Sequence, residues 1–122
     1  MKQLMTKQFS KWITKQRIPK TELTKVIQEV KAGNFEANFG GQIYKKRIRF
    51  KGKGKSGSGR TIVCYKKKDR IIFIHGFAKN EKSNLTKKEL VGFKEFAQIL
   101  LDLSSDDIDT AIKNGNFIEV KS

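Results

Sequence analysis

The sequence predicts an α+β fold, in which two N-terminal helices pack on a small antiparallel β-sheet and further helices follow towards the C-terminus. Three observations lead to this prediction. Apolar residues recur every three or four positions near both ends of the chain, as in amphipathic helices. Between residues 43 and 78, short alternating or apolar runs are separated by glycine-rich or charged turns, as in strands. The connections between these runs are short, which favours an antiparallel meander.

The length of 122 residues is typical of one domain, so we expect residues 1–122 to form a single domain. The single Cys64 excludes an internal disulfide, and no cluster of cysteine and histidine offers a zinc site. The N-terminus lacks the apolar core of a secretory signal, and no apolar run approaches the ~20 residues of a membrane span. We therefore expect a cytoplasmic protein with no metal, cofactor or membrane partner.

Two amphipathic helices are predicted before the sheet. The first is predicted at Met5–Arg17, and Pro19 prevents it from continuing. The second begins with Thr21 as its N-cap and ends at Gly33. Both helices carry lysines opposite their apolar face, so we expect them to cover one side of the sheet. Their predicted core residues are Phe9, Trp12, Ile13, Leu23, Val26, Ile27 and Val30.

Three strands are predicted next, at Ile43–Phe50, Arg60–Lys67 and Ile71–Ala78. The period of two in the first strand places a row of cations on one surface, opposite Tyr44, Lys46, Ile48 and Phe50. That row consists of Lys45, Arg47 and Arg49.

The third predicted strand is apolar on both faces, so it should be central and covered on both sides. One face is expected to hold Ile71, Phe73 and Phe77, and the other Ile72, Ile74 and Ala78. His75 lies within this strand. It is interpreted as a core residue or, because its reference pKa is near neutrality, as a proton-transfer group.

The C-terminal third begins with a capping box formed by Thr86 and Glu89, which starts a helix that runs through Leu101. The same pattern at Ser104 starts a shorter helix that ends near Gly115. The segment Phe117–Val120 is predicted to add a final short strand.

The charge of the chain indicates a polyanionic partner. The formal net charge is +15, and residues 42–70 hold most of the excess, with Asp69 as their one acidic residue. Such a surface attracts polyanions, and nucleic acid is the commonest of them.

The segment Gly52–Arg60 combines four glycines with Lys53, Lys55 and Arg60 between two predicted strands. Such a loop suits a phosphodiester group, because glycine lets the backbone approach closely. It is not a Walker A loop, because the glycine spacing is shorter and a strand follows instead of a helix. The alternative is a hairpin tip whose charges are simply solvated.

The residues exclude several kinds of catalysis. No carboxylate pair suits glycoside or metal-dependent phosphoryl chemistry, and hydrolase and dinucleotide-binding patterns are absent. Metal-independent RNA cleavage remains, because the substrate's ribose 2′-hydroxyl is then the nucleophile and the protein supplies cations, proton transfer and positioning. Composition alone does not separate this reaction from simple binding.

Three stretches carry a resemblance to a known family: residues 41–47, residues 52–61 and residues 76–85. They read GQIYKKR, GKGKSGSGRT and GFAKNEKSNL. Together they resemble the RelE/HigB toxins of type II toxin–antitoxin systems, within the RelE/ParE superfamily. The resemblance implies a RelE-like α/β toxin that cleaves mRNA in the ribosomal A site, contacts 16S rRNA and is neutralised by a cognate antitoxin, expected to be a helix-turn-helix DNA-binding protein.

The resemblance also assigns residues. It implies that Lys53, Lys55, Arg60 and Lys79 are catalytic, stabilising the charge on phosphorus and taking part in proton transfer. RNA binding is expected of further residues in and beside these stretches: Lys45, Lys46, Arg47, Arg49, Lys51, Asn80 and Lys82. Relatives carry arginine where Asn80 stands, and the C-terminal catalytic tyrosine of some has no match here. The general acid and base are therefore unassigned, with Lys79, Arg49 and His75 as candidates.

Two alternatives stay open. A non-catalytic binder of ribosomal or other RNA would show salt-sensitive binding without cut ends. A gyrase poison on the related ParE scaffold would cause DNA damage signalling without mRNA cleavage, although the lysine-rich loop favours RNA.

Overall fold

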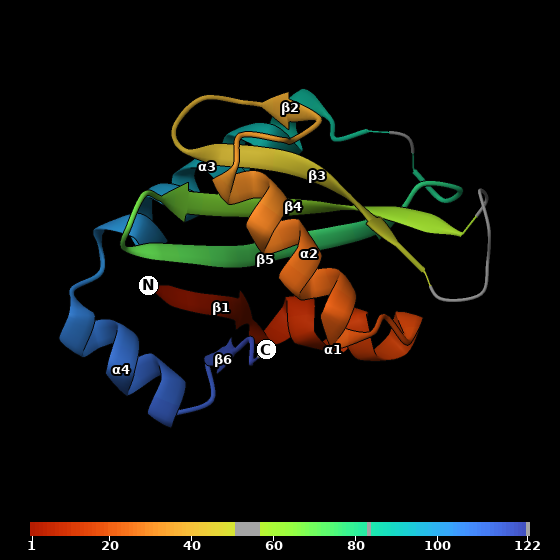
Figure 1. Cartoon of the computed structure of the whole chain (residues 1–122). Helices are drawn as coiled ribbons and strands as arrows, with labels where there is room; N and C mark the ends of the chain where they lie inside the picture. Colours follow the sequence, from red (N-terminus) through yellow and green to blue (C-terminus); the bar gives the residue numbers. More distant parts are fainter. Residues whose placement is uncertain (51–56, 83, 122) are drawn as a thin grey trace.

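The computed structural model describes residues 1–50, 57–82 and 84–121. Within them, four helices and one mostly antiparallel, six-stranded sheet confirm the predicted α+β class. The strand order across the sheet is β2-β3-β4-β5-β1-β6 (Figure 1). In chain order the elements are β1 (Lys2–Thr6), α1 (Lys7–Gln16), α2 (Lys20–Lys31), β2 (Ala37–Asn38), β3 (Ile43–Arg49), β4 (Ser58–Lys66), β5 (Arg70–Ala78), α3 (Lys87–Asp102), α4 (Ser105–Lys113) and β6 (Phe117–Glu119).

The predicted meander is present as β3, β4 and β5, which pair antiparallel in chain order. A tight turn joins β4 to β5, and Lys68 in this turn has a left-handed φ of 66°. As expected, β5 is central and covered on both sides, since Ile71, Ile72 and Phe73 are all fully buried.

The start of the chain differs from the prediction. The first residues form β1, and the helix predicted from Met5 begins only at Lys7, after Thr6 accepts a hydrogen bond from the backbone of Phe9 as N-cap. β1 lies between β5, to which it is parallel, and β6, to which it is antiparallel (Figure 1). Leu4 is fully buried there, because this position is inside the sheet instead of at the end of a helix.

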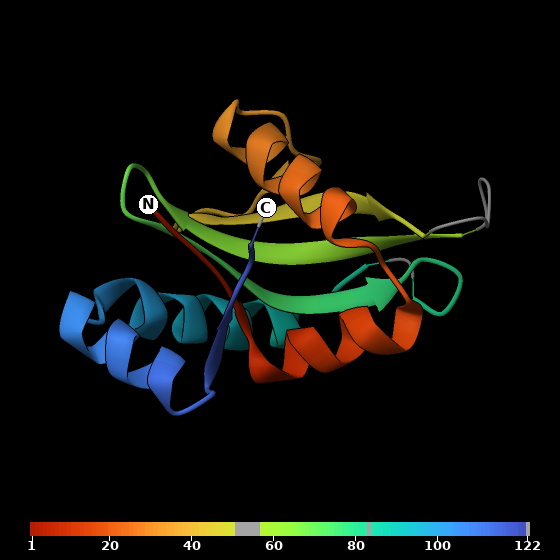
Figure 2. The same ribbon diagram turned by 60° about the horizontal axis from the view of Figure 1, so that its bottom comes forward.

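Two apolar layers sandwich the sheet, and α2 and α3 lie on opposite sides of it (Figure 2). One layer joins residues of α1 and α2, including Phe9 and Ile27, to Phe73 of β5. The other joins α3 and α4 to the opposite face, with Leu101 and Ile108 against the sheet. The predicted core face of α2 is confirmed: Leu23, Val26, Ile27 and Val30 are buried.

The predicted N-cap of α2 is wrong, although its end is close to the prediction. Pro19 occupies the N-cap position and Thr21 is already inside the helix. Proline fits this position because the N-cap has an extended backbone, with φ of −72° at Pro19, and the proline ring fixes φ near that value. Gly33 follows the helix with a left-handed φ of 83°, as expected of a residue that ends a helix.

A β-bulge changes the faces of β5. The register skips one residue, because Ile62 pairs with His75 whereas Val63 pairs with Phe73. Beyond the bulge, Phe77 belongs to the layer under α3, and Ala78 to the layer under α1 and α2. The prediction for these two residues was therefore wrong: an extra residue in one strand exchanges the two faces.

The C-terminal predictions are confirmed. Thr86 and Glu89 form a complete capping box at the start of α3. Ser104 caps α4 through the backbone N–H of Asp107, and β6 follows. No helix in the described ranges is both long enough and apolar enough to cross a membrane.

Candidate functional site

Arg60 is the central charged residue of the candidate site. It lies near the start of β4, opposite Arg47 of β3 and Phe77 of β5. Its side chain is only 8% exposed. Its Nε donates a hydrogen bond to Oε2 of Glu36 at 2.8 Å, and its Nη1 donates to the carbonyl oxygen of Gly59 at 3.1 Å. The sheet thus holds a fixed, partly covered guanidinium group.

Lys45 and Glu36 connect Arg60 to neighbouring segments. Nζ of Lys45 lies 3.8 Å from Oε2 of Glu36 and donates to Oδ1 of Asn84 at 3.4 Å. Asn84 precedes α3, so this network joins β3, β4, the segment before β2 and the segment before α3. No motif or periodic pattern in the sequence predicts a role for Glu36, which is 24 residues from Arg60 in the chain.

The row of cations predicted on β3 is beside Arg60. Arg47 and Arg49 are exposed, and they pair in register with Arg60 and Ser58. Like charges directly opposite each other in a sheet destabilise it. A folded chain that keeps Arg47 opposite Arg60 therefore has a surface suited to an added anion.

Lys46 is separate from this group, as the period of two predicts. It shares its face with Tyr44 and Ile48, and its Nζ forms an ion pair with Oε2 of Glu29 on α2 at 2.9 Å. It lines a hollow of about 190 Å³ between α2 and β3, together with Glu22, Lys25, Val26, Glu29, Arg47 and Arg49. Arg47 and Arg49 thus border both the candidate site and this hollow, whose lining carries charges of both signs.

The segment after β5 holds further predicted residues. Lys79 and Asn80 are exposed, and the backbone N–H of Lys79 donates to the carbonyl of Ser58 at 3.1 Å. This bond anchors Lys79 beside the start of β4, two residues from Arg60. Lys82 is instead engaged in an ion pair with Glu89. That contact, followed by the hydrogen bond from the backbone of Thr86, lowers the pKa of Glu89 to about 2.

His75 lies on β5 opposite Ile62, half-buried on the side of the sheet that faces α3. Its ring packs on Phe93 of α3, with a centroid distance of 4.7 Å. Burial lowers its pKa below the usual value, while Glu89 opposes and Lys82 adds to this shift. The imidazole is thus predominantly neutral at pH 7 and able to accept a proton.

Three predicted lysines, Lys51, Lys53 and Lys55, lie outside the described residues. The flanking residues locate the two ends of their segment. The backbone N–H of Phe50 donates to the carbonyl of Gly57 at 2.8 Å, and Arg49 pairs with Ser58. Both ends of the segment are therefore at the same end of the sheet as Arg60.

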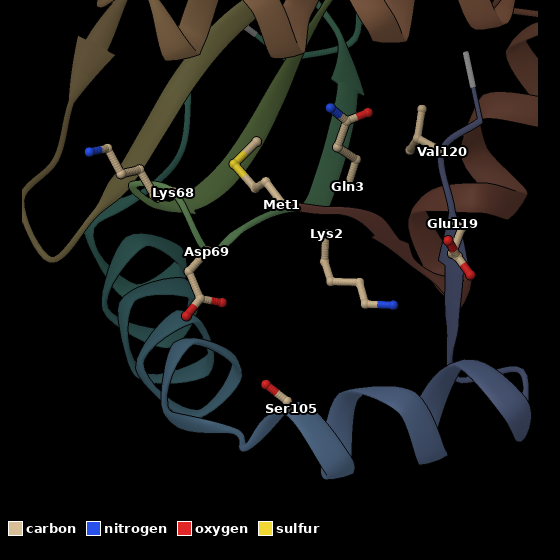
Figure 3. Close-up of a pocket in the computed structure, with 8 residues that line it drawn as sticks. All are labelled: Met1, Lys2, Gln3, Lys68, Asp69, Ser105, Glu119 and Val120. Carbon is tan, nitrogen blue, oxygen red and sulfur yellow. The ribbon is translucent and has the colours of Figure 1, made fainter.

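A second hollow lies at the opposite end of β4 and β5. It measures about 500 Å³, and Figure 3 shows its lining, in which the N-terminal residues, the turn after β4, the start of α4 and the end of β6 meet. Acidic and basic side chains alternate around it, so it offers no single-sign field to a ligand. Its lining residues are Met1, Lys2, Gln3, Lys68, Asp69, Ser105, Glu119 and Val120. Across the described ranges, no group of three or more histidine, cysteine or carboxylate side chains is placed to bind a metal ion.

Comparison with known protein families identifies a match. The family model described as the RelE toxin of the RelE/RelB toxin–antitoxin system matches residues 1–120. No curated protein and no solved structure matches the chain.

Proposed function

The chain belongs to the RelE toxin family, and from that premise we propose that it is a ribosome-dependent endonuclease that cleaves mRNA without a metal ion and so inhibits translation. Membership itself makes the chain the toxin of a toxin–antitoxin system, in a family whose members are generally endoribonucleases that act with the ribosome and pair with an antitoxin. The site of cleavage and the residues that perform it belong to the proposal.

One observation supports this proposal best: a fixed Arg60 guanidinium beside exposed Arg47 and Arg49, at the end of the sheet where β3 ends and β4 begins. In the proposed reaction the ribose 2′-oxygen forms a bond to the adjacent phosphorus and the bond from phosphorus to the 5′-oxygen breaks. A base takes the proton of the 2′-hydroxyl, and an acid protonates the 5′-oxygen. The products are a 2′,3′-cyclic phosphate and a 5′-hydroxyl end.

Negative charge builds up on the non-bridging oxygens as phosphorus becomes five-coordinate. Cations that are already held in place stabilise this charge without reorganising during the reaction. Arg60, whose guanidinium is held by Glu36 and by the carbonyl of Gly59, is proposed for this role. Lys53, Lys55 and Lys79 are proposed to add positive charge to the same reaction. His75 shares the face of Arg60 on the neighbouring strand and is mostly neutral at pH 7, which suits a general base. Lys79 and Arg49 remain the other candidates for proton transfer.

The proposed RNA-binding surface extends from this centre. The exposed cations on β3 and the polar residues between β5 and α3 are proposed to bind phosphates of mRNA and of 16S rRNA. Lys46 lies on the other face with Glu29, so it would contact RNA only from the α2 side. The other residues proposed to bind RNA are Lys45, Arg47, Arg49, Asn80 and Lys82, together with Lys51, which lies outside the described residues.

The cognate antitoxin is proposed to be a helix-turn-helix DNA-binding protein with an acidic segment that covers the cations around Arg47, Arg49 and Arg60. The negative charge of such a segment would complement the positive potential of this surface, so the segment would compete with RNA. Antitoxin binding and RNA binding should therefore exclude each other when measured on the same sample.

The test compares wild type with Arg60→Ala on expression in cells, reading growth and mRNA ends by primer extension. Loss of one preorganised donor to a developing oxyanion costs on the order of 10²–10³-fold in rate. Lys66→Ala is the matched control, because it removes an exposed cation from the far end of the same strand. Undiminished cutting by a folded Arg60→Ala variant would refute the role of Arg60.

The alternatives give different results in the same experiment. Growth arrest without new mRNA ends, together with salt-sensitive RNA binding, would indicate a non-catalytic binder. Growth arrest with DNA damage signalling and intact mRNA would indicate a gyrase poison.

A further inference from the structure

Glu36 is an acidic residue that the fold brings into contact with both Arg60 and Lys45 of the candidate site. It directly precedes β2, and its backbone N–H donates to the carbonyl of Lys45 at 2.8 Å. Its Oε2 accepts from Nε of Arg60 at 2.8 Å and lies 3.8 Å from Nζ of Lys45. The backbone contact fixes the segment to β3, so the carboxylate is held in place by the sheet.

The contact determines how the guanidinium is held. Glu36 binds at Nε and the carbonyl of Gly59 binds at Nη1, so two points on the same plane fix the orientation of the group. Among the described residues, no hydrogen bond uses Nη2. Glu36 and the carbonyl of Gly59 thus leave Nη2 as the guanidinium nitrogen that we infer would donate to a phosphate.

The charges around Arg60 show why a carboxylate is needed. Arg47 stands directly opposite Arg60 in the sheet, and Lys45 lies on the neighbouring strand, so Arg60 is surrounded by like charge. The Arg60 side chain is nearly covered, whereas that of Glu36 is 35% exposed. Without Glu36, repulsion would favour rotamers that carry the guanidinium away from this position.

We propose that Glu36 is a positioning residue: it holds the Arg60 guanidinium in the orientation that stabilises the phosphorus transition state, and it does not itself contact RNA. The inference rests on the proposed function, since it concerns the same site. It adds a residue that the family resemblance did not assign, from a segment that carries none of the matching motifs.

The experiment measures kcat and KM for mRNA cleavage on programmed ribosomes. Glu36→Ala should lower kcat on the order of tenfold to a hundredfold, because small misplacement of a reacting group has effects of this size, while KM changes less than about twofold. Glu36→Gln should retain more activity than Glu36→Ala, because its amide oxygen can still accept from Nε. Glu119→Ala is the control, since it removes an exposed strand carboxylate at the far edge of the sheet.

The Arg60→Ala background separates positioning from direct catalysis. If Glu36 acts through Arg60, adding Glu36→Ala to the Arg60→Ala variant should lower kcat for mRNA cleavage by less than about twofold. An equal loss in both backgrounds would show that Glu36 acts independently of Arg60. Disappearance of the acidic limb of the pH–rate profile would show that Glu36 itself transfers a proton. Faster cleavage by Glu36→Ala would show that Glu36 blocks Arg60. Each of these results overturns the proposal.

A readout independent of activity distinguishes failure of this inference from failure of the proposed function. The Nε–H of Arg60 should give a slowly exchanging NMR resonance, assigned through Arg60→Lys, that moves or broadens in Glu36→Ala. Absence of any cleavage by wild type, with this resonance behaving as expected, would refute the nuclease and retain the contact. Cleavage by wild type with no effect of Glu36→Ala on resonance or kcat would refute the role of Glu36 alone.

Discussion

Gly76→Ala is expected to loosen the contact between α1 and the sheet. A Cβ on Gly76 would lie 2.4 Å from Cε3 and Cζ3 of Trp12, whereas ordinary contacts begin at 3.4 Å. The φ of Gly76 lies outside the left-handed region, so the effect is steric. The indole ring must therefore retreat by roughly 1 Å, a displacement typical of overpacked cores.

The surroundings of the indole determine the cost of this displacement. The Trp12 ring packs on Phe9, at 5.7 Å between centroids, and edge-on against Phe50 at 6.0 Å. Because these neighbours resist movement, we expect a loss of about 1–3 kcal/mol in the free energy of unfolding. With an unfolding entropy of about 2.1 cal/mol/K per residue, this corresponds to a Tm lower by about 4–12 °C.

Thermal unfolding followed by circular dichroism checks the expectation. Gly92→Ala is the matched control: this glycine is in α3 with nothing within 4 Å of the added Cβ, so alanine should raise Tm by about 4 °C through helix propensity alone. In a Trp12→Ala background the cost of Gly76→Ala should disappear. A Gly76→Ala protein with the Tm of wild type would refute the steric argument.

Two further predictions concern titratable groups. Burial raises the pKa of the Cys64 thiol to about 12, so iodoacetamide should modify it only after unfolding, as mass spectrometry can check; rapid labelling of the folded protein would contradict this. The pKa of Glu89 is lowered to about 2, so the stability from its contacts with Lys82 and Thr86 is complete above about pH 4.5 and lost as the pH falls towards 2. Glu89→Gln should flatten stability against pH in that window, measured by urea unfolding, and an unchanged slope would count against the contact.

Local sequence patterns predicted much of the fold. The capping box at Thr86 and the buried face of α2 depend on residues three or four positions apart, and both are confirmed. The alternation in β3, which separates Lys46 from Lys45 and Arg47, is likewise a property of one strand. These features are decided within a few residues, so the sequence contains the information directly.

The errors come from partners that are distant in the chain. β1 was missed for two reasons. Its five residues are too few to show a period of two, and the strands that pair with it, β5 and β6, begin far along the chain, at Arg70 and Phe117. Phe77 and Ala78 lie on faces opposite to those predicted because one residue of β5 is unpaired in the β4–β5 register. The alternation of apolar residues along a single strand cannot reveal such a bulge. Both depend on pairing between strands.

The candidate site divides in the same way. Its cations were recognised from charge and motif, and Arg60, Arg47 and Lys45 do lie together. Glu36 was not recognised, because it is 24 residues from Arg60 and lies in a segment without periodicity. The assigned roles, including those of Lys53, Lys55 and Lys79, stay predictions.

The place of β1 affects the order in which a growing chain can complete its fold. Synthesis delivers β1 first, yet its two edges are covered by residues 70–73 and 117–119. Strand pairs between residues this far apart in the sequence form late and slowly. A polypeptide released before residue 117 would contain every proposed site residue, yet the β1 edge of its sheet would still be exposed, which invites aggregation or degradation. Quality control in the cell would then remove truncated molecules of a harmful product.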